Sequence, residues 1–225
     1  MLRGRGRDHL RRGVAIVRSP SFQATLLTIV AGIADAVGYI TMGAVFAANM
    51  TGNTVLAGIA AGHGRYSDAL NHLSPLVTFF AGAMLARLIL RLCRKPAPAI
   101  GLEALILAGL GFLPDGVEIK VLIVAFAMGL QASAITHFAG TSISTVVVTS
   151  TLARTADAAL DALVPGTASV SPATTTPRLL LLTWLGYLIG AIAGALLLTV
   201  TSHPLLVPAA LLVLVIFLRG VTSEA

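Results

Sequence analysis

Apolar residues fill most of the chain in long segments, and short polar or small-residue stretches separate them. About 20 apolar residues are enough for one helix to cross a bilayer. Helices are the expected element, because unpaired backbone groups cannot be left in lipid. The pattern therefore predicts an all-α fold, a polytopic helical membrane bundle. The apolar segments lie at about 22–41, 44–62, 73–92, 98–113, 118–137, 143–160, 178–200 and 204–218.

The first two segments decide how many times the chain crosses the membrane. The stretch from Phe22 to Gly62 carries a single formal charge, Asp35, and could hold either two full helices or one full helix followed by a broken or re-entrant one. The basic residues Arg94 and Lys95 follow the third segment, and basic loops favour the cytoplasmic side. They share that side with the N-terminal arm only if the first two segments make one net crossing. We favour six net crossings with both termini cytoplasmic, and eight full helices are the alternative.

Composition supports a membrane protein. The chain is 56% hydrophobic and 11% charged, with a mean hydropathy of +0.93, whereas soluble domains carry roughly 25% charged residues. We divide it into a basic cytoplasmic arm (1–21) that attracts anionic lipids, one transmembrane domain (22–218) and a short tail (219–225). Because the basic residues lie beside apolar segments, the formal charge of +6 indicates membrane topology and not nucleic-acid binding.

Two halves of the chain resemble each other. "GIADA" at Gly32 matches "GLQAS" at Gly129, and "MTGNTVLA" at Met50 matches "VTSTLART" at Val148, with an offset of about 97 residues. Repeats at about 22–113 and 118–218 would each make three net crossings, so the second copy would be inverted, as in many secondary transporters. Shared Gly, Ala and Thr content is the simpler explanation.

Asp35 is costly inside a membrane. Insertion scales put an ionised carboxylate there at about 2.5–3.5 kcal/mol, so the residue needs compensation. Gly32 and Gly38 lie three positions to either side and share its helical face. We predict that Asp35 faces a polar cavity, where it binds a cation or takes up a proton. A structural acid that caps the neighbouring broken helix, or pairs with a cation, is the alternative.

The stretch "NMTGNT" is typical of a helix break. Gly52 relaxes the backbone, while Asn49, Thr51 and Asn53 can cap a new helix, and Thr54 follows them. The free N–H groups at such a start favour anionic or carbonyl-bearing ligands. Alternatively, these side chains only satisfy the interrupted backbone.

The second half offers a corresponding polar set that could hydrogen-bond a solute or join helix to helix. It consists of Gln131, Ser133, Thr149, Ser150 and Thr151. The spacing of Gly186, Gly190 and Gly194 indicates close helix packing. Arg87 and Glu103 are the other charged residues within apolar segments, and snorkelling or a mutual ion pair explains them.

Signatures of enzymes and cofactor sites are absent from the sequence. We find no P-loop, dinucleotide fingerprint, HExxH or nucleophile elbow, and the single cysteine, Cys93, rules out an internal disulfide or a Cys-based metal site. We expect no cofactor, no metal and no enzymatic activity. An intramembrane enzyme with scattered residues remains an alternative.

Three motifs resemble the YoaK family of bacterial membrane proteins, which has no established biochemical activity. They are Gly-x-x-Asp-Ala-x-Gly at 32–38, Asn-Met-Thr-Gly-Asn at 49–53 and Ala-Met-Gly-Leu-Gln at 127–131, and the similarity covers roughly residues 22–218. The chain departs from the family at Ala132, where Asn is frequent, and at 149–151, where Thr-Gly-Thr is usual. The resemblance implies an architecture and a candidate site but no reaction.

The resulting expectation is a secondary transporter or channel-like carrier of a small polar solute in the bacterial cytoplasmic membrane, with proton coupling through Asp35 as an option. A noncatalytic membrane scaffold or accessory subunit is the alternative. Assembly with further copies of the chain is left open.

Overall fold

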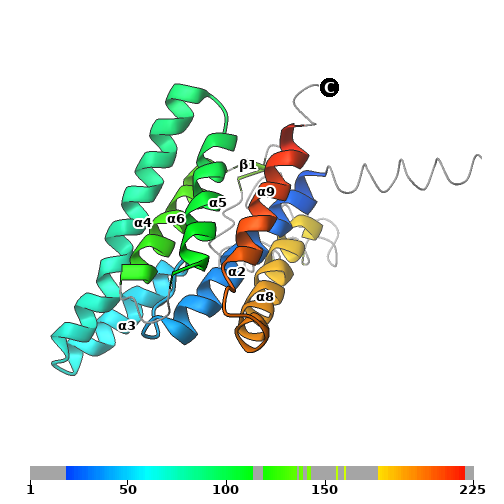
Figure 1. Cartoon of the computed structure of the whole chain (residues 1–225). Helices are drawn as coiled ribbons and strands as arrows, with labels where there is room; N and C mark the ends of the chain where they lie inside the picture. The colour runs from blue at the N-terminus through cyan, green and yellow to red at the C-terminus, as the bar shows by residue number, and fades with distance from the viewer. Residues whose placement is uncertain are drawn as a thin grey trace, which may run out of the picture.

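The computed structural model describes residues 19–113, 119–135, 137–138, 141–142, 156, 160 and 177–220. Seven helices span these residues almost completely (Figure 1), so the predicted all-α fold is confirmed. One antiparallel pairing of two residues each, β1 (His137–Phe138) with β2 (Thr141–Ser142), is also present. The helices are α2 (Pro20–Thr41), α3 (Met50–Gly62), α4 (Tyr66–Cys93), α5 (Ala97–Gly111), α6 (Ile119–Ala134), α8 (Pro177–Val200) and α9 (Leu206–Gly220).

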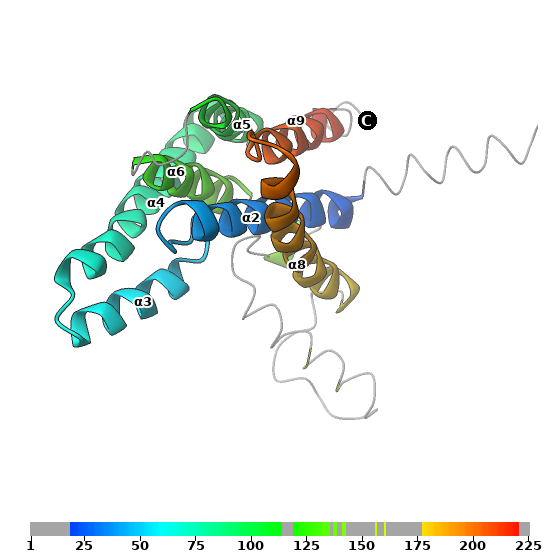
Figure 2. The same ribbon diagram turned by 60° about the horizontal axis from the view of Figure 1, so that its bottom comes forward.

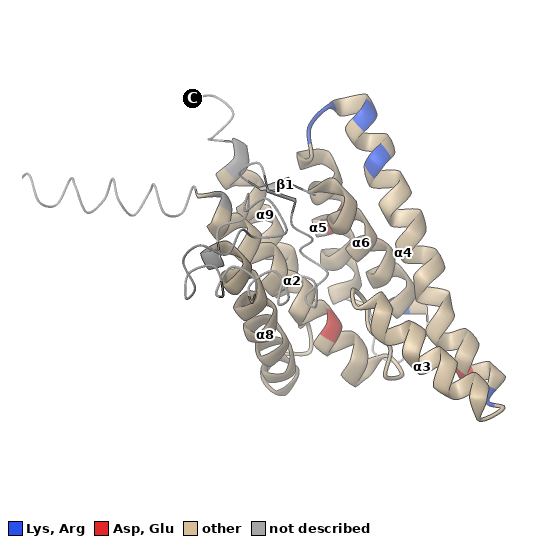
Figure 3. Cartoon of the chain, turned by 180° about the vertical axis from the view of Figure 1, so that it is seen from behind, with Lys and Arg blue, Asp and Glu red and all other residues tan. Residues whose placement is uncertain are grey.

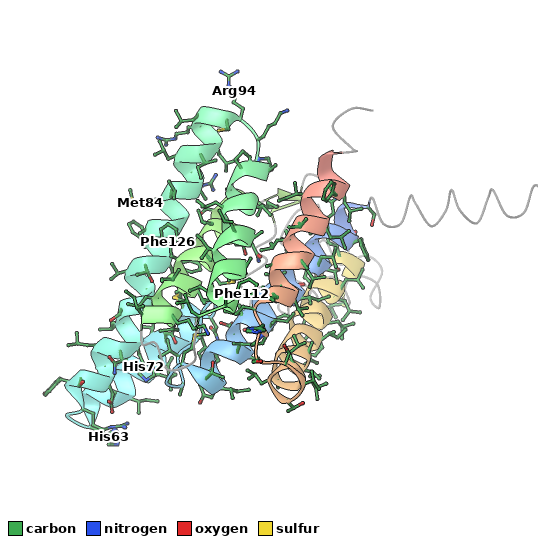
Figure 4. All side chains as sticks on the ribbon, in the orientation of Figure 1. His63, His72, Met84, Arg94, Phe112 and Phe126 are labelled. Atoms are coloured by element: carbon green, nitrogen blue, oxygen red, sulfur yellow. The ribbon has the colours of Figure 1, made fainter. Side chains whose placement is uncertain are left out.

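Helix length and surface both fit a bilayer. Ser21–Thr41, Tyr66–Cys93 and Leu179–Val200 are long and apolar enough to cross it, and α5, α6 and α9 are shorter apolar helices. Large apolar side chains of α4 point outward along its whole length, as the side chain of Met84 does in Figure 4. Such a surface is unfavourable in water and favourable against lipid tails. The protein is therefore a helical membrane bundle.

The ends of several helices gather at one end of the bundle. The N-terminal end of α2 and the C-terminal ends of α4 and α9 lie there (Figure 1). Figure 3 shows that the basic residues of α4 are concentrated near its C-terminal end. Figure 4 places Arg94 and His63 at opposite ends of α4, so α4 extends through the bundle.

The second apolar segment does not form a second long helix. Helix α3 has 13 residues, which gives about 20 Å, against roughly 30 Å for the hydrocarbon core. It packs beside α4 (Figure 2). Residues between α2 and α3 form a loop with left-handed backbone at Gly43 and Ala44. The predicted break after the first helix is therefore present.

Two close helix pairs organise the bundle. Helix α2 packs mainly on α8, and α4 packs mainly on α6. A Cβ atom on Gly190 would lie 2.3 Å from the backbone oxygen of Ile29, and one on Gly186 would lie 2.4 Å from the hydroxyl of Thr28. Side chains there would clash, so the predicted close packing through glycine is confirmed. Helix α9 packs on α5 and on α2, and α5 packs also on α6.

Candidate functional site

Asp35 lies on α2 between two glycines, Gly32 and Gly38, which let the backbone of neighbouring segments approach closely. Its side chain is 3% exposed. A Cβ atom on Gly32 would lie 2.2 Å from the backbone oxygen of Tyr187 on α8, and one on Gly38 would lie 3.0 Å from that of Val45 in the loop before α3. The shared face that the sequence predicts therefore receives α8 at one glycine and the loop at the other, with Asp35 between them.

The carboxylate of Asp35 accepts hydrogen bonds from both neighbours. Its Oδ1 accepts from the backbone N–H of Ala48 at 2.5 Å and of Asn49 at 3.2 Å. Its Oδ2 accepts from the hydroxyl of Tyr187. Hydrogen bonds to a charged group contribute about 1.5–3 kcal/mol each, so these three donors offset part of the desolvation of the carboxylate. Helix α2, helix α8 and the start of α3 meet at this one side chain, which we call the Asp35 junction.

Tyr187 was missed in the sequence. It lies in an apolar helix with no polar residue on either side in "LGYLIG". The one available signal was chemical: a buried Tyr hydroxyl usually finds a hydrogen-bond partner. That signal predicts that a partner exists but does not identify it.

The loop before α3 is fixed by two asparagines. Asn49 is the N-cap of α3, and its Oδ1 accepts from the N–H of Gly52 at 3.0 Å, so its predicted capping role is confirmed. Asn53 is fully buried. Its Oδ1 accepts from the N–H of Phe46 at 2.9 Å, and its Nδ2 donates to the oxygen of the same residue at 2.8 Å. Asn53 therefore holds the loop against α3 instead of capping the helix.

The two threonines of the motif point away from this junction. Thr51 and Thr54 are both exposed, and the hydroxyl of Thr54 donates to the backbone oxygen of Met50 within the same helix. The rings of Tyr39 and Phe46 stack 4.8 Å apart between α2 and the loop. The structure thus brings Asp35, Asn49, Gly52 and Asn53 together and leaves the threonines at the surface.

Of the polar set predicted for the second half, the residues that the structure describes are Gln131 and Ser133, and neither is one of the three donors to Asp35. Gln131 is fully buried on α6, and its Nε2 donates to the backbone oxygen of Leu27 at 3.0 Å. Leu27 lies about two turns before Asp35 on α2, or roughly 12 Å along the axis. Ser133 is partly buried near the end of α6. Residues 149–151, with the predicted Thr149, Ser150 and Thr151, lie outside the described residues.

A second buried carboxyl group lies on α5. Glu103 is fully buried, and neither of its oxygens has a hydrogen-bond partner among the described residues. Arg87 is exposed, and the described part of the chain has one ion pair, between Arg65 and Asp68. The mutual ion pair of Arg87 and Glu103 is therefore wrong. Exposure of Arg87 fits snorkelling.

In the described part of the chain, no three His, Cys, Asp or Glu side chains gather as a metal site would require. The junction instead presents one carboxylate, one phenol and backbone amides. These groups bind or transfer protons and hydrogen-bond polar solutes.

Together these features define a polytopic helical membrane protein with a buried acid at a helix junction. The family model described as "Protein of unknown function (DUF1275)" matches residues 23–218, and the chain belongs to that family. It is similar to the "UPF0700 transmembrane protein YoaK" of Bacillus subtilis (strain 168), with 37% identity over 140 residues. That match covers 57% of this chain and 62% of the relative. No solved structure matches.

Proposed function

We propose that the protein is a secondary transporter or channel-like carrier of a small polar solute in a bacterial cytoplasmic membrane, built from two inverted repeats. The observation that carries the proposal is the agreement between its two close helix pairs. A Cβ atom on Gly32 of α2 would meet the backbone oxygen of Tyr187 on α8 at 2.2 Å, and one on Gly129 of α6 would meet that of Phe79 on α4 at 2.0 Å. Gly32 and Gly129 are the residues that the sequence repeat aligns.

Glycines on the partner helices, α8 and α4, make equally close contacts back to α2 and α6. A Cβ atom on Gly190 of α8 would meet the oxygen of Ile29 at 2.3 Å, and one on Gly82 of α4 would meet that of Phe126 at 2.0 Å. Helices α2 and α6 correspond at one sequence offset, which relates Gly32 to Gly129 and Ile29 to Phe126. Helices α8 and α4 correspond at a second offset, which relates Tyr187 to Phe79 and Gly190 to Gly82. This agreement supports two repeats with exchanged partners, a common plan of secondary transporters.

The arrangement also supports six net crossings with both termini in the cytoplasm. Helix α3 is short, and α2 and α4 run in opposite directions (Figure 1). The basic residues Arg91 and Arg94 then lie at the end of the bundle that holds the N-terminal end of α2. Basic loops favour the cytoplasm. We also propose that the arm (1–21) contacts anionic lipids.

Proton coupling would act through the Asp35 junction. When it is ionised, the carboxylate can accept three hydrogen bonds, from the loop amides and from Tyr187. Protonation would remove the charge that strengthens these bonds and would add a donor where donors already point. Loading a proton would therefore loosen the contact of α2 with α8 and α3. A bistable contact of this kind is what a carrier needs in order to alternate between two states.

The test is transport by purified protein in liposomes that contain a trapped pH-sensitive dye. Amino acids, sugars and nucleobases are added outside in turn, and acidification of the lumen is measured. We expect one solute class to drive proton entry in the wild type and in Asp68→Asn, an exposed control, and not in Asp35→Asn. Solute uptake that persists without proton movement in all three proteins would reject the coupling while keeping the carrier.

A noncatalytic scaffold or accessory subunit is the second candidate. One observation favours it: Asp35, Asn49 and Asn53 all have hydrogen-bond partners within the chain, as packing alone would require. It predicts that Asp35→Asn lowers thermal stability and that no solute of the panel drives flux in the wild type. Self-association through the lipid-facing surface would be compatible with either candidate.

A further inference from the structure

Two acids are buried in the bundle, and their surroundings differ. Asp35 on α2 has three hydrogen-bond donors. Glu103 on α5 is fully buried, and both of its oxygens lack a partner among the described residues. Figure 3 colours the acidic positions of both helices red. Helix α9 packs against both α2 and α5, but Glu103 has no hydrogen bond to Asp35 or to its donors among the described residues.

Among the described side chains, no charged group on the helices packed against α5 pairs with Glu103. The described side chains of α9, Leu206–Leu218, include no titratable group. On α6 the one titratable residue is Lys120, whose Nζ donates to the oxygen of Leu113 beyond the far end of α5. His203 contacts the oxygen of Gly111, roughly two turns from Glu103. The titratable residues of α4 are Tyr66, Asp68, His72, Arg87, Arg91 and Cys93.

None of the residues on α4 pairs with Glu103. Arg87, Arg91 and Cys93, on the half of α4 nearer the start of α5, are exposed. Asp68 is paired with Arg65 at the opposite end of that helix. The neighbours of Glu103 on its own face of α5 are instead apolar: Ile100 and Leu107 lie three and four positions away, and both are fully buried.

An ionised carboxylate without donors is strongly disfavoured in such a place, whereas a neutral carboxylic acid is tolerated. When two acids of one protein lie in contrasting environments, their protonation states separate. We propose that Glu103 is a proton-binding site inside the membrane domain: at neutral pH its carboxyl holds a proton, and it releases that proton when water or a donor reaches it. This site is distinct from the Asp35 junction, and the inference does not depend on the carrier proposal.

Infrared spectroscopy of the full-length protein in lipid membranes tests this directly, because a protonated carboxylic acid has a carbonyl stretching band that a carboxylate lacks. Spectra at neutral pH are compared for the wild type, Glu103→Gln, Asp35→Asn and the exposed control Asp68→Asn. We expect the band of a buried acid in all of them except Glu103→Gln, where it should be lost. On raising the pH, its disappearance in the wild type reports release of the proton.

A spectrum of Glu103→Gln that matches the wild type in this band at neutral pH would overturn the proposal, because Glu103 would then be ionised. Glutamine is nearly the same shape and also neutral, so we expect this variant to fold. If it does not, Glu103→Asp takes its place: a shifted band supports the proposal and an unmoved band overturns it.

Discussion

The hydroxyl of Tyr187 on α8 donates a hydrogen bond to Oδ2 of Asp35 on α2, although 152 positions separate the two residues in sequence. The opposite oxygen of the same carboxylate accepts from the amides of Ala48 and Asn49. One side chain thus connects the first helix to a helix near the end of the chain and to the start of α3. Asp35 is costly in an apolar bundle, and it is retained where it joins three segments.

Tyr187→Phe should lower stability while leaving the helix packing intact. The change removes the hydroxyl donor and keeps the ring, so the carboxylate of Asp35 loses one of its three hydrogen bonds. We expect a loss of about 1.5–3 kcal/mol, measured as a lower thermal unfolding midpoint in detergent. Tyr39→Phe is the matched control, since Tyr39 is 42% exposed and stacks on Phe46 through its ring. An equal midpoint for the two variants would contradict the role of the Tyr187 bond.

Alanine at either interface glycine should disrupt its helix pair. A Cβ atom on Gly32 would lie 2.2 Å from the backbone oxygen of Tyr187, and one on Gly129 would lie 2.0 Å from that of Phe79. Overpacking usually costs about 1–3 kcal/mol, and backbone atoms cannot move aside easily. We expect both variants to yield less folded protein and to unfold at lower temperature. Gly58→Ala should be neutral or slightly stabilising, because an added Cβ there would meet no atom within 4 Å beyond its own stretch of helix backbone.

Asn53→Ala should release the loop before α3. It deletes both hydrogen bonds to the backbone of Phe46 and leaves partly buried backbone groups without these partners, at up to about 1–3 kcal/mol each. The Asp35 amide contacts, which lie in the same loop, should weaken as well. Hydrogen exchange of residues 43–49 should therefore accelerate in Asn53→Ala. Thr51→Ala, at an exposed position of the same helix, should leave both stability and exchange nearly unchanged.

Local sequence patterns predicted the helices and the helix break, but they did not predict which side chains bond to one another across helices. Apolar segments predicted the described helices, whereas the segment at about 143–160 lies almost wholly outside the described residues. The stretch "NMTGNT" predicted the break and the cap at Asn49, because capping depends on residues three positions apart. Tyr187 escaped detection because its partner lies far away in sequence. Gln131 was predicted to hydrogen-bond a solute or to join helix to helix, and its bond to Leu27 joins α6 to α2; the sequence does not identify that partner, because it depends on packing. The ion pair between Arg87 and Glu103 is also wrong, because packing buries Glu103 and leaves Arg87 exposed.

The native cysteine offers a test of membrane orientation. Cys93 is exposed at the C-terminal end of α4, beside Arg91 and Arg94. If this end is cytoplasmic, a membrane-impermeant maleimide should label Cys93 in inverted vesicles and leave it unlabelled in intact cells. In a Cys93→Ser background, Gly64→Cys between α3 and α4 should show the opposite pattern, because Gly64 lies at the other end of α4. Labelling of both positions from one side would exclude α4 as a crossing helix.

The inverted-repeat proposal makes a residue-level prediction about the second helix pair. If Gly32 corresponds to Gly129 and Tyr187 to Phe79, then Asp35 corresponds to Ala132, so the polar contact of one pair is replaced by Ala132 and Phe79 in the other. Ala132→Asp should be strongly destabilising, because a partly buried charge gains no donor. Adding Phe79→Tyr should recover part of that loss, with a coupling of about 1–2 kcal/mol in a double-mutant cycle, within the range for residues in contact. Thermal unfolding of the wild type, both single variants and the double variant measures the coupling. Additive effects would mean that residues 79 and 132 are not related as Tyr187 and Asp35 are, and the correspondence between the repeats would fail at this position.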